Sequence, residues 1–469
     1  MAKLNKEKEE LNLESKNQGN NKKRPLKRSM IGLEMEFMLL NNKGKVVNKA
    51  DEILAAVKKK EPETNIVKEC GKNMVELGCY PSVKMFNTAL DILKHAETLY
   101  DVASKKDLLL HCFGTYPGKF DPEVRNNINY LMKKKIFGEE RFLAAARCIG
   151  FHHHYALPRG MYNPLTKFIR VTFDGKIKRS FMGSYNFEIA ADPALTCIMQ
   201  SSPFYQGQHF AMDTRLPVYR GGKKLKYMDG VYANLQQIGG LPPYKQTEMD
   251  LIESLNRKVQ RWMKVLKKHN ENAKFDEIYN SKLDVNWGPV KVNNHGTLEQ
   301  RGMDMNYPSN IMATSVLLKF CLMKIHREFL EVEPADIGIK EPFKIEDNRM
   351  YVPPHTFVRN KLQYFSAYEG LNNKHMENYV KRFLRMAKKF TNKSYQKSIR
   401  PVINMYEENN TVSTQILKKA RKLGWEKETE LDNETAQELS LHFTDKFYKD
   451  LVNTIELLKK IDVTANYSF

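Results

Sequence analysis

The chain contains little cysteine and no long apolar run. Its 469 residues include six cysteines, and none of them lies in a CxxC motif or in the Cys/His spacing typical of zinc sites. We therefore expect reduced thiols and no structural zinc. No apolar run approaches the roughly 18 residues that a membrane span needs, and the N-terminus lacks the apolar core of a secretory signal. These absences predict a cytoplasmic protein without a membrane partner.

Composition indicates a folded protein with a strong positive charge. Hydrophobic residues make up 41% of the chain and aromatic residues 10%, which is typical of a globular protein. The length allows a large core and more than one structural unit. The net charge of +21 is uneven: residues 1–29 carry nine Lys/Arg against four Glu, and residues 374–400 carry nine against one.

The basic segments raise the possibility of nucleic-acid binding, because lysine and arginine bind phosphate without sequence preference. In residues 374–400, however, apolar residues recur at helical spacing, which predicts an amphipathic helix with a solvated basic face. No motif of a nucleic-acid-binding domain is present. A nucleic-acid-associated protein is therefore an alternative hypothesis, and nucleic acid is not an expected partner.

Strand-like and helix-like segments are mixed without regular alternation, which favours the α+β class. We expect a flexible basic tail over 1–29, a catalytic domain over 30–330 and a mainly helical region over 331–469 that packs on it. The predicted strands are 31–40, 111–116, 148–157 and 287–303. The predicted helices are 51–60, 86–106, 139–146, 247–268 and 310–329, with a further helical pattern over 433–460.

Three predicted strands place polar residues two positions apart. They carry Glu34 with Glu36, His152 with His154, and Glu299 with Arg301. Because residues i and i+2 project from the same face of a strand, each pair points into one space. A half-exposed strand, a buried histidine pair and a simple ion pair are the alternative interpretations of the three segments.

A fourth segment adds two carboxylates. A hairpin turn centred on Lys72-Asn73 would place Glu69 directly opposite Glu76, and two like charges in that position are destabilising without a counter-ion. Five glutamates with one or two imidazoles favour hard divalent cations, Mg²⁺ or Mn²⁺, over zinc. Several such cations require a polyanion such as ATP. The chain has no Walker motif and no GxGxxG, so phosphates would be held by metals and arginines.

In their order along the chain, these segments resemble glutamate–cysteine ligase family 2, the carboxylate–amine ligases of the glutamine synthetase superfamily. The resemblance runs from about Ile31 to Asn310. It also includes Ser201-Ser202-Pro203-Phe204, Asp213-Thr214 and Tyr219-Arg220. It implies a curved antiparallel β-sheet that forms an open funnel flanked by helices, with ATP entering at one end and glutamate at the other.

The resemblance also implies roles for individual residues. Glu36, Glu69 and Glu76 would hold one metal, and Glu34, His152 and Glu299 a second. His154 would approach the nucleotide phosphates and Arg301 the transferred γ-phosphate, and Arg220 would bind an amino-acid carboxylate. Glu299 and Arg301 are thus the expected catalytic residues.

Three positions depart from the family pattern, on the side of the second substrate. Arg215 replaces the glycine of Asp-Thr-Gly, Tyr116 stands in Gly114-Thr115-Tyr116-Pro117 where Gly-x-His-Pro is usual, and Asn286 to Lys291 lacks the expected arginine. The function expected is an ATP-dependent ligase joining the γ-carboxylate of glutamate to an amine, with cysteine as acceptor, in glutathione biosynthesis. Another amine acceptor, a homo-oligomer and a degenerate ligase that only binds or regulates remain open.

Overall fold

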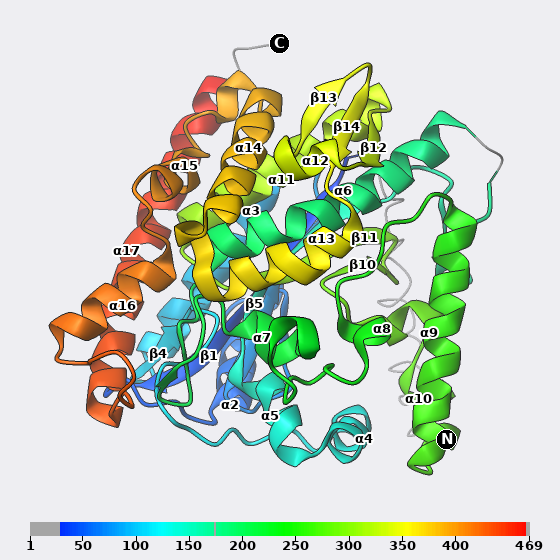
Figure 1. Ribbon diagram of the computed structural model, residues 1–469. Helices are drawn as coiled ribbons and strands as arrows, with labels where there is room; N and C mark the ends of the chain where they lie inside the picture. The colour runs from blue at the N-terminus through cyan, green and yellow to red at the C-terminus, as the bar shows by residue number, and fades with distance from the viewer. Residues whose placement is uncertain (1–28, 173–174, 466–469) are drawn as a thin grey trace, which may run out of the picture.

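A computed structural model of the chain describes residues 29–172 and 175–465. The predicted flexible tail, residues 1–29, therefore lies almost wholly outside the described residues. Within them the fold is a mixture of helices with one large antiparallel sheet, as the sequence predicts (Figure 1).

The large sheet has seven strands in the order β10-β11-β5-β1-β3-β2, and β4 pairs with the far end of β1. Every pair in it is antiparallel. The strands are β1 (Ile31–Asn41), β2 (Ile66–Lys68), β3 (Met74–Gly78), β4 (Leu108–His111), β5 (Gly150–Ala156), β10 (Val290–Asn293) and β11 (Thr297–Asp304).

A smaller sheet has three strands, with β14 (Arg349–Val352) between β12 (Glu331–Pro334) and β13 (Lys344–Glu346). The longer helices are α2 (Ala50–Lys60), α3 (Met85–Ser104), α4 (Ile128–Phe137), α5 (Glu139–Arg147), α6 (Lys176–Met199), α9 (Glu248–Lys268), α11 (Pro308–Glu328), α14 (Lys374–Phe390), α15 (Arg400–Glu407), α16 (Val412–Lys422) and α17 (Asn433–Ala465).

Helices cover one face of the large sheet. Helix α3 contacts β1, α11 contacts β5, α6 contacts β10 and β11, and α17 contacts β4. In Figure 1, α17 (red) runs along one side of the molecule and α9 (green) along the opposite side. The other face of the sheet carries the acidic and imidazole side chains, and we call it the polar face.

The alternation in β1 explains this division. Leu33, Met35 and Phe37 are almost fully buried and belong to the main apolar core, whereas Glu34 and Glu36 point to the polar face. That core is continuous from Ile31 to Leu458, so residues on both sides of position 330 share it. The division into 30–330 and 331–469 does not coincide with a break in the core.

One expected element was wrong, and two features of the fold were not predicted. The strand predicted over 111–116 ends at His111 as β4, so the chain has already left the sheet at Tyr116. The region after 331 contains mostly helices and also the strands β12, β13 and β14, which were not predicted. Helix α6 was not predicted. All its residues from Ser180 to Met199 are buried, so no polar face marks it in the sequence.

The amphipathic helices were predicted correctly. Helix α9 begins with a capping box, in which Thr247 accepts from the backbone of Asp250 and the Asp250 side chain accepts in return. In α14 the apolar stripe is buried while Lys381, Arg385 and Lys388 are exposed. Among the described residues, every helix is too short or too polar to cross a membrane.

Candidate active site

Strand register brings the predicted polar residues together on the polar face. Glu36 lies opposite Glu76 in the β1–β3 pair, and Glu34 lies opposite His152 in the β1–β5 pair. On the next strand, Glu299 lies opposite His154. Four strands therefore contribute a continuous row of carboxylates and imidazoles, as the i, i+2 spacing predicts.

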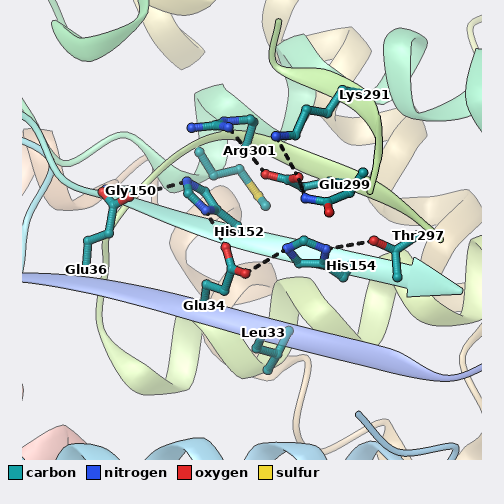
Figure 2. A network of polar contacts seen from close by, with 12 residues as sticks. Leu33, Glu34, Glu36, Gly150, His152, His154, Lys291, Thr297, Glu299 and Arg301 are labelled. Atoms are coloured by element: carbon teal, nitrogen blue, oxygen red, sulfur yellow. Dashed lines mark hydrogen bonds and ion pairs between the residues drawn. The ribbon is translucent and has the colours of Figure 1, made fainter. Parts of the chain in front are cut away.

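Glu34 lies at the centre of the row, between the two histidine rings (Figure 2). Its Oε2 is 2.8 Å from Nδ1 of His152, and its Oε1 is 3.3 Å from Nε2 of His154. Burial alone would raise the pKa of Glu34, but the charge of His154 and the hydrogen bonds of both rings hold that pKa well below its usual range. Glu34 is therefore an ionised, preorganised carboxylate.

The predicted hairpin register is wrong by two residues. Val67, not Glu69, lies opposite Glu76, and β2 ends at Lys68. The turn itself lies at Lys72-Asn73 as predicted, where the backbone N–H of Met74 donates to the carbonyl of Gly71 at 3.2 Å, but Gly71 forms a bridge with Val124 and residues 69–71 lie outside β2. Glu69 nevertheless reaches the polar face from this segment.

Three overlapping groups on this face could each hold a metal ion. The first triad is Glu36, Glu69 and Glu76; the second is Glu34, Glu76 and His152; the third is Glu34, His154 and Glu299. In each, one ligand atom per residue lies within 4.8 Å of the others. The first matches a ligand set implied by the family. The other implied set is split, because Glu34 and Glu299 meet His154 in the third triad, while His152 belongs to the second.

The first triad is an excess of buried negative charge. Burial and then the charge of Glu36 raise the pKa of Glu69 to about 7. Burial and the charges of Glu34, Glu69 and Glu36 raise the pKa of Glu76 well above its usual range. No lysine or arginine among the described residues forms an ion pair with this triad within 4.0 Å. Carboxylates crowded in this way are what a divalent cation stabilises.

The second and third triads contain imidazoles whose Nε2 atoms are buried and face carboxylates. Nε2 of His152 lies 3.5 Å from Oε1 of Glu36, and Nε2 of His154 lies 3.3 Å from Oε1 of Glu34. Because Nδ1 of His152 is hydrogen bonded to Glu34, a proton on that nitrogen leaves the Nε2 lone pair available. The donor set of oxygen atoms with one imidazole nitrogen therefore fits Mg²⁺ or Mn²⁺.

Positive charge gathers at the β11 end of the row. Oε2 of Glu299 is 3.2 Å from Nζ of Lys291 and accepts from the side chain of Asn293, while its Oε1 is 3.6 Å from Arg301. Burial would raise the pKa of Glu299, but Lys291, His154 and Arg301 lower it far below its usual range. Glu299 and Glu36 in turn raise the pKa of Arg301 against the effect of burial.

Arg215 supports this end of the sheet from within. The β5–β11 register shifts between Gln300 and Met303, a β-bulge that frees backbone carbonyls. The Arg215 guanidinium donates to the carbonyl oxygens of Arg301 (3.2 Å) and Met303 (3.3 Å). The Arg215 guanidinium thus contacts the backbone that carries Arg301, and beside its predicted substrate-binding role we propose that it positions Arg301.

Two further predicted substrate residues are also engaged elsewhere. Arg220 is buried and donates to both carboxylate oxygens of Asp192, at 2.6 and 2.8 Å, and to Gln363. The guanidinium expected to bind a substrate carboxylate thus binds one from the protein itself. Tyr116 is buried away from the row, and its hydroxyl donates to the carbonyl of Gly44.

Sequence reasoning missed the lysines near the site. Lys291 was noted only as part of a segment that lacks an arginine, although its place on β10, opposite Glu299, could be inferred from a hairpin at Asn294–Gly296. Lys133 of α4 lies over the ring of Trp287, and burial lowers its pKa to about 8. Nothing in the sequence indicates that Lys133 lies close to Arg301 and Glu69.

A cavity of about 200 Å³ adjoins the row at Glu34 and His154. Thr297, Met30, Asn65 and Pro81 are among its other lining residues. Gly32 and Gly78 also line it. A Cβ atom at Gly78 would lie 2.5 Å from the Asn65 amide nitrogen, so any larger residue there would displace the Asn65 side chain, which also lines the cavity.

The cysteines play no part in the row. All six are buried and free of disulfides, as expected for reduced thiols. Burial raises the pKa of Cys79, which lines the cavity, to about 12. A thiol of this kind is a poor nucleophile.

Comparison with known proteins identifies a family. The family model described as glutamate-cysteine ligase family 2 matches residues 30–397. No curated protein sequence matches the chain. Among solved structures, a bifunctional glutathione synthetase from Pasteurella multocida matches at 11% identity with a TM-score of 0.51, covering 89% of this chain and 52% of that one. This chain therefore spans about half the length of that relative.

A second solved structure is a glutamate–cysteine ligase from Francisella tularensis in complex with AMP. It matches at 12% identity with a TM-score of 0.48 and covers 93% of both chains. At these identities the likeness to solved structures concerns the fold alone.

Proposed function

The chain belongs to glutamate–cysteine ligase family 2, and from this membership we propose that it is an ATP-dependent ligase joining the γ-carboxylate of glutamate to an amine. The observation that carries the proposal is the first triad, three crowded carboxylates beside the guanidinium of Arg301 on one face of the sheet. This arrangement is suited to phosphoryl transfer, which needs positioned cations more than a protein nucleophile.

The carboxylates are the proposed metal ligands. Glu36, Glu69 and Glu76 would hold one divalent cation, and Glu34 with His152 and Glu76 would hold another. Bound Mg²⁺ or Mn²⁺ supplies charge neutralisation for the phosphates and the leaving group. Glu34 is fixed for this purpose by its contacts with the two histidine rings.

The nucleotide is proposed to enter beside Glu34. The cavity lined by Glu34 and His154 is the entrance next to the triads, and His154 would meet the phosphates there. Arg301 would bind the transferred γ-phosphate, because a guanidinium matches phosphate oxygens with paired donors. The sheet would then form the wall of the open funnel that the family resemblance implies.

The reaction follows from these placements. An oxygen of the substrate carboxylate attacks the γ-phosphorus of ATP, ADP leaves, and an acyl phosphate forms. The amine then attacks the acyl carbon and phosphate leaves. Arg301 stabilises the charge that develops on the transferred group. Cysteine is the acceptor we propose first, with another amino acid or a small amine as the alternative.

The test is phosphate release from ATP. Purified protein with ATP, Mg²⁺ and glutamate is assayed against a panel of amines, beginning with cysteine. We expect release that requires glutamate and increases with the natural acceptor. Arg301→Lys, which keeps the charge but loses the paired donors, should reduce the rate by about a hundredfold or more. Phosphate release that ignores glutamate across the whole panel would contradict the donor assignment.

A further inference from the structure

We propose that the ammonium group of Lys291 takes the place of a divalent cation at the third triad, Glu34, His154 and Glu299. The chain would then hold its metals at the first and second triads only. This inference deepens the proposed function and rests on it. It concerns which positive charges in the proposed active site come from protein side chains and which come from bound metal ions.

The first step is strand register. Strands β10 and β11 are antiparallel, and Lys291 lies directly opposite Glu299. Side chains of directly opposed residues project from the same face of the sheet, so the lysine is held beside the triad by the backbone and not by a flexible loop. The Lys291 side chain is 12% exposed and that of Glu299 is 2% exposed. The pair is therefore shielded from solvent.

The second step is that Glu299 is fully engaged by protein donors. Its Oε2 meets Lys291 at 3.2 Å and accepts from the Asn293 amide, and its Oε1 faces the Arg301 guanidinium at 3.6 Å (Figure 2). A metal ion at this triad would have to displace these donors and lie close to a fixed positive charge. Like-charge repulsion in a shielded site opposes that arrangement.

The third step is the contrast with the first triad. There Glu36, Glu69 and Glu76 crowd together, and no described lysine or arginine pairs with them within 4.0 Å. The two ends of one row therefore differ in charge balance, because Glu299 forms ion pairs with Lys291 and Arg301, whereas among the described residues no lysine or arginine forms an ion pair with the first triad within 4.0 Å. Divalent ions are needed only where the protein has not already supplied positive charge.

The experiment counts bound Mn²⁺ by the electron paramagnetic resonance signal of the free ion, in titrations of the full chain without ATP. Lys291→Met should bind one more Mn²⁺ ion than wild type, or bind its last ion at least about tenfold more tightly. Lys291→Arg, which keeps the charge, should match wild type. The double variant Lys291→Met/Glu299→Gln should lose the gain. Glu299→Gln alone should leave the wild-type count unchanged.

A matched control is Lys178→Met, which removes a lysine 2.6 Å from the buried Glu248 on α9, a carboxylate outside the three triads. It should not change the count. An ion lost from Glu299→Gln while Lys291 is in place, or no gain in a folded Lys291→Met protein, would overturn the proposal. If Lys291→Met fails to fold, as judged by circular dichroism, the Glu299→Gln count decides alone. Absence of ligase activity would leave these counts unaffected and would count against the proposed function instead.

Discussion

Glu36 and Glu76 lie directly opposite each other on the adjacent strands β1 and β3. Opposed like charges weaken a sheet, and here Glu69 adds a third carboxylate to the same space. The folded strands thus create an electrostatic repulsion that proton uptake relieves in part, because the pKa values of Glu69 and Glu76 are both raised. A bound cation would relieve this repulsion. The increase in protein stability on adding a cation therefore measures cation binding at this site.

The first prediction concerns Glu76→Gln. At neutral pH the amide should raise the free energy of unfolding of the metal-free protein by about 1 kcal/mol or more, because burial and the neighbouring carboxylates raise the pKa of Glu76 and folding then requires this carboxyl to take up a proton. The same change should abolish most of the stabilisation that Mn²⁺ gives to wild type. Urea unfolding with and without Mn²⁺ measures both effects. Glu346→Gln, an exposed strand carboxylate on β13, should change neither by more than about 0.5 kcal/mol. Loss of stability in metal-free Glu76→Gln would show that the triad is not repulsive.

The second prediction is a dependence of stability on pH in the absence of metal. The pKa of Glu69 rises from 4.5 to about 7 in the folded state, so the folded protein holds this proton more tightly than the unfolded chain. That contribution is complete below pH 4.5 and is lost as pH rises towards 7. At 1.36 kcal/mol per pKa unit it amounts to roughly 3 kcal/mol.

Comparison of wild type with Glu69→Gln isolates this contribution from other titrating groups. The difference between their free energies of unfolding should change between pH 4.5 and 7 and be flat above that range. Saturating Mn²⁺ should remove the pH dependence, because the cation takes the place of the proton. A difference that stays constant from pH 4 to pH 8 would mean that Glu69 is not crowded by its neighbours.

Local pattern was enough to predict the row of ligands. A period of two identifies which face of a strand a side chain takes, so Glu34 with Glu36 and His152 with His154 could be placed before any fold was known. The order of the strands in the sheet is not contained in that pattern. Register across the sheet decides that His154, and not His152, meets Glu299.

Other features depend on distant contacts. The backbone before the Lys72-Asn73 turn bridges to Val124 at Gly71, while the β2–β3 register differs by two residues from the predicted one, and no local signal indicates the bridge. Arg220 and Arg215 were placed on the substrate side by the family resemblance. Their partners, Asp192 and the backbone carbonyls of β11, come from other parts of the chain. A buried guanidinium is satisfied by whatever acceptor the fold provides, so its role cannot be assigned from the residue type alone.

The third prediction concerns Glu299→Gln, which should reduce turnover by at least about a thousandfold while leaving the protein folded. Glu299 holds both Arg301 and Lys291 in place, so the neutral amide frees two cations that the transferred phosphate needs. The rate of phosphate release and the melting temperature are measured together. Turnover within about tenfold of wild type would remove Glu299 from the site.

The fourth prediction tests the positioning role of Arg215. Arg215→Met leaves two carbonyls of the β-bulge without donors, which should lower the free energy of unfolding by about 1–3 kcal/mol. Because the bulge carries Arg301, kcat should fall more than the apparent affinity for glutamate. Arg215→Lys should recover part of the rate. A change in KM for one amine with kcat intact would instead place Arg215 at the acceptor.

The last prediction separates donor from acceptor. If the metal and phosphate residues activate glutamate, then glutamate, ATP, Mg²⁺ and hydroxylamine should yield the γ-hydroxamate, because hydroxylamine attacks the acyl phosphate whichever amine is natural. The natural acceptor should then suppress the hydroxamate by competing for the same carbonyl. No hydroxamate from glutamate would contradict the donor, while hydroxamate that cysteine fails to suppress would contradict only cysteine. Arg215, Arg220 and Tyr116 all form hydrogen bonds within the protein, so their contacts do not identify the acceptor, and competition among amines has to identify it.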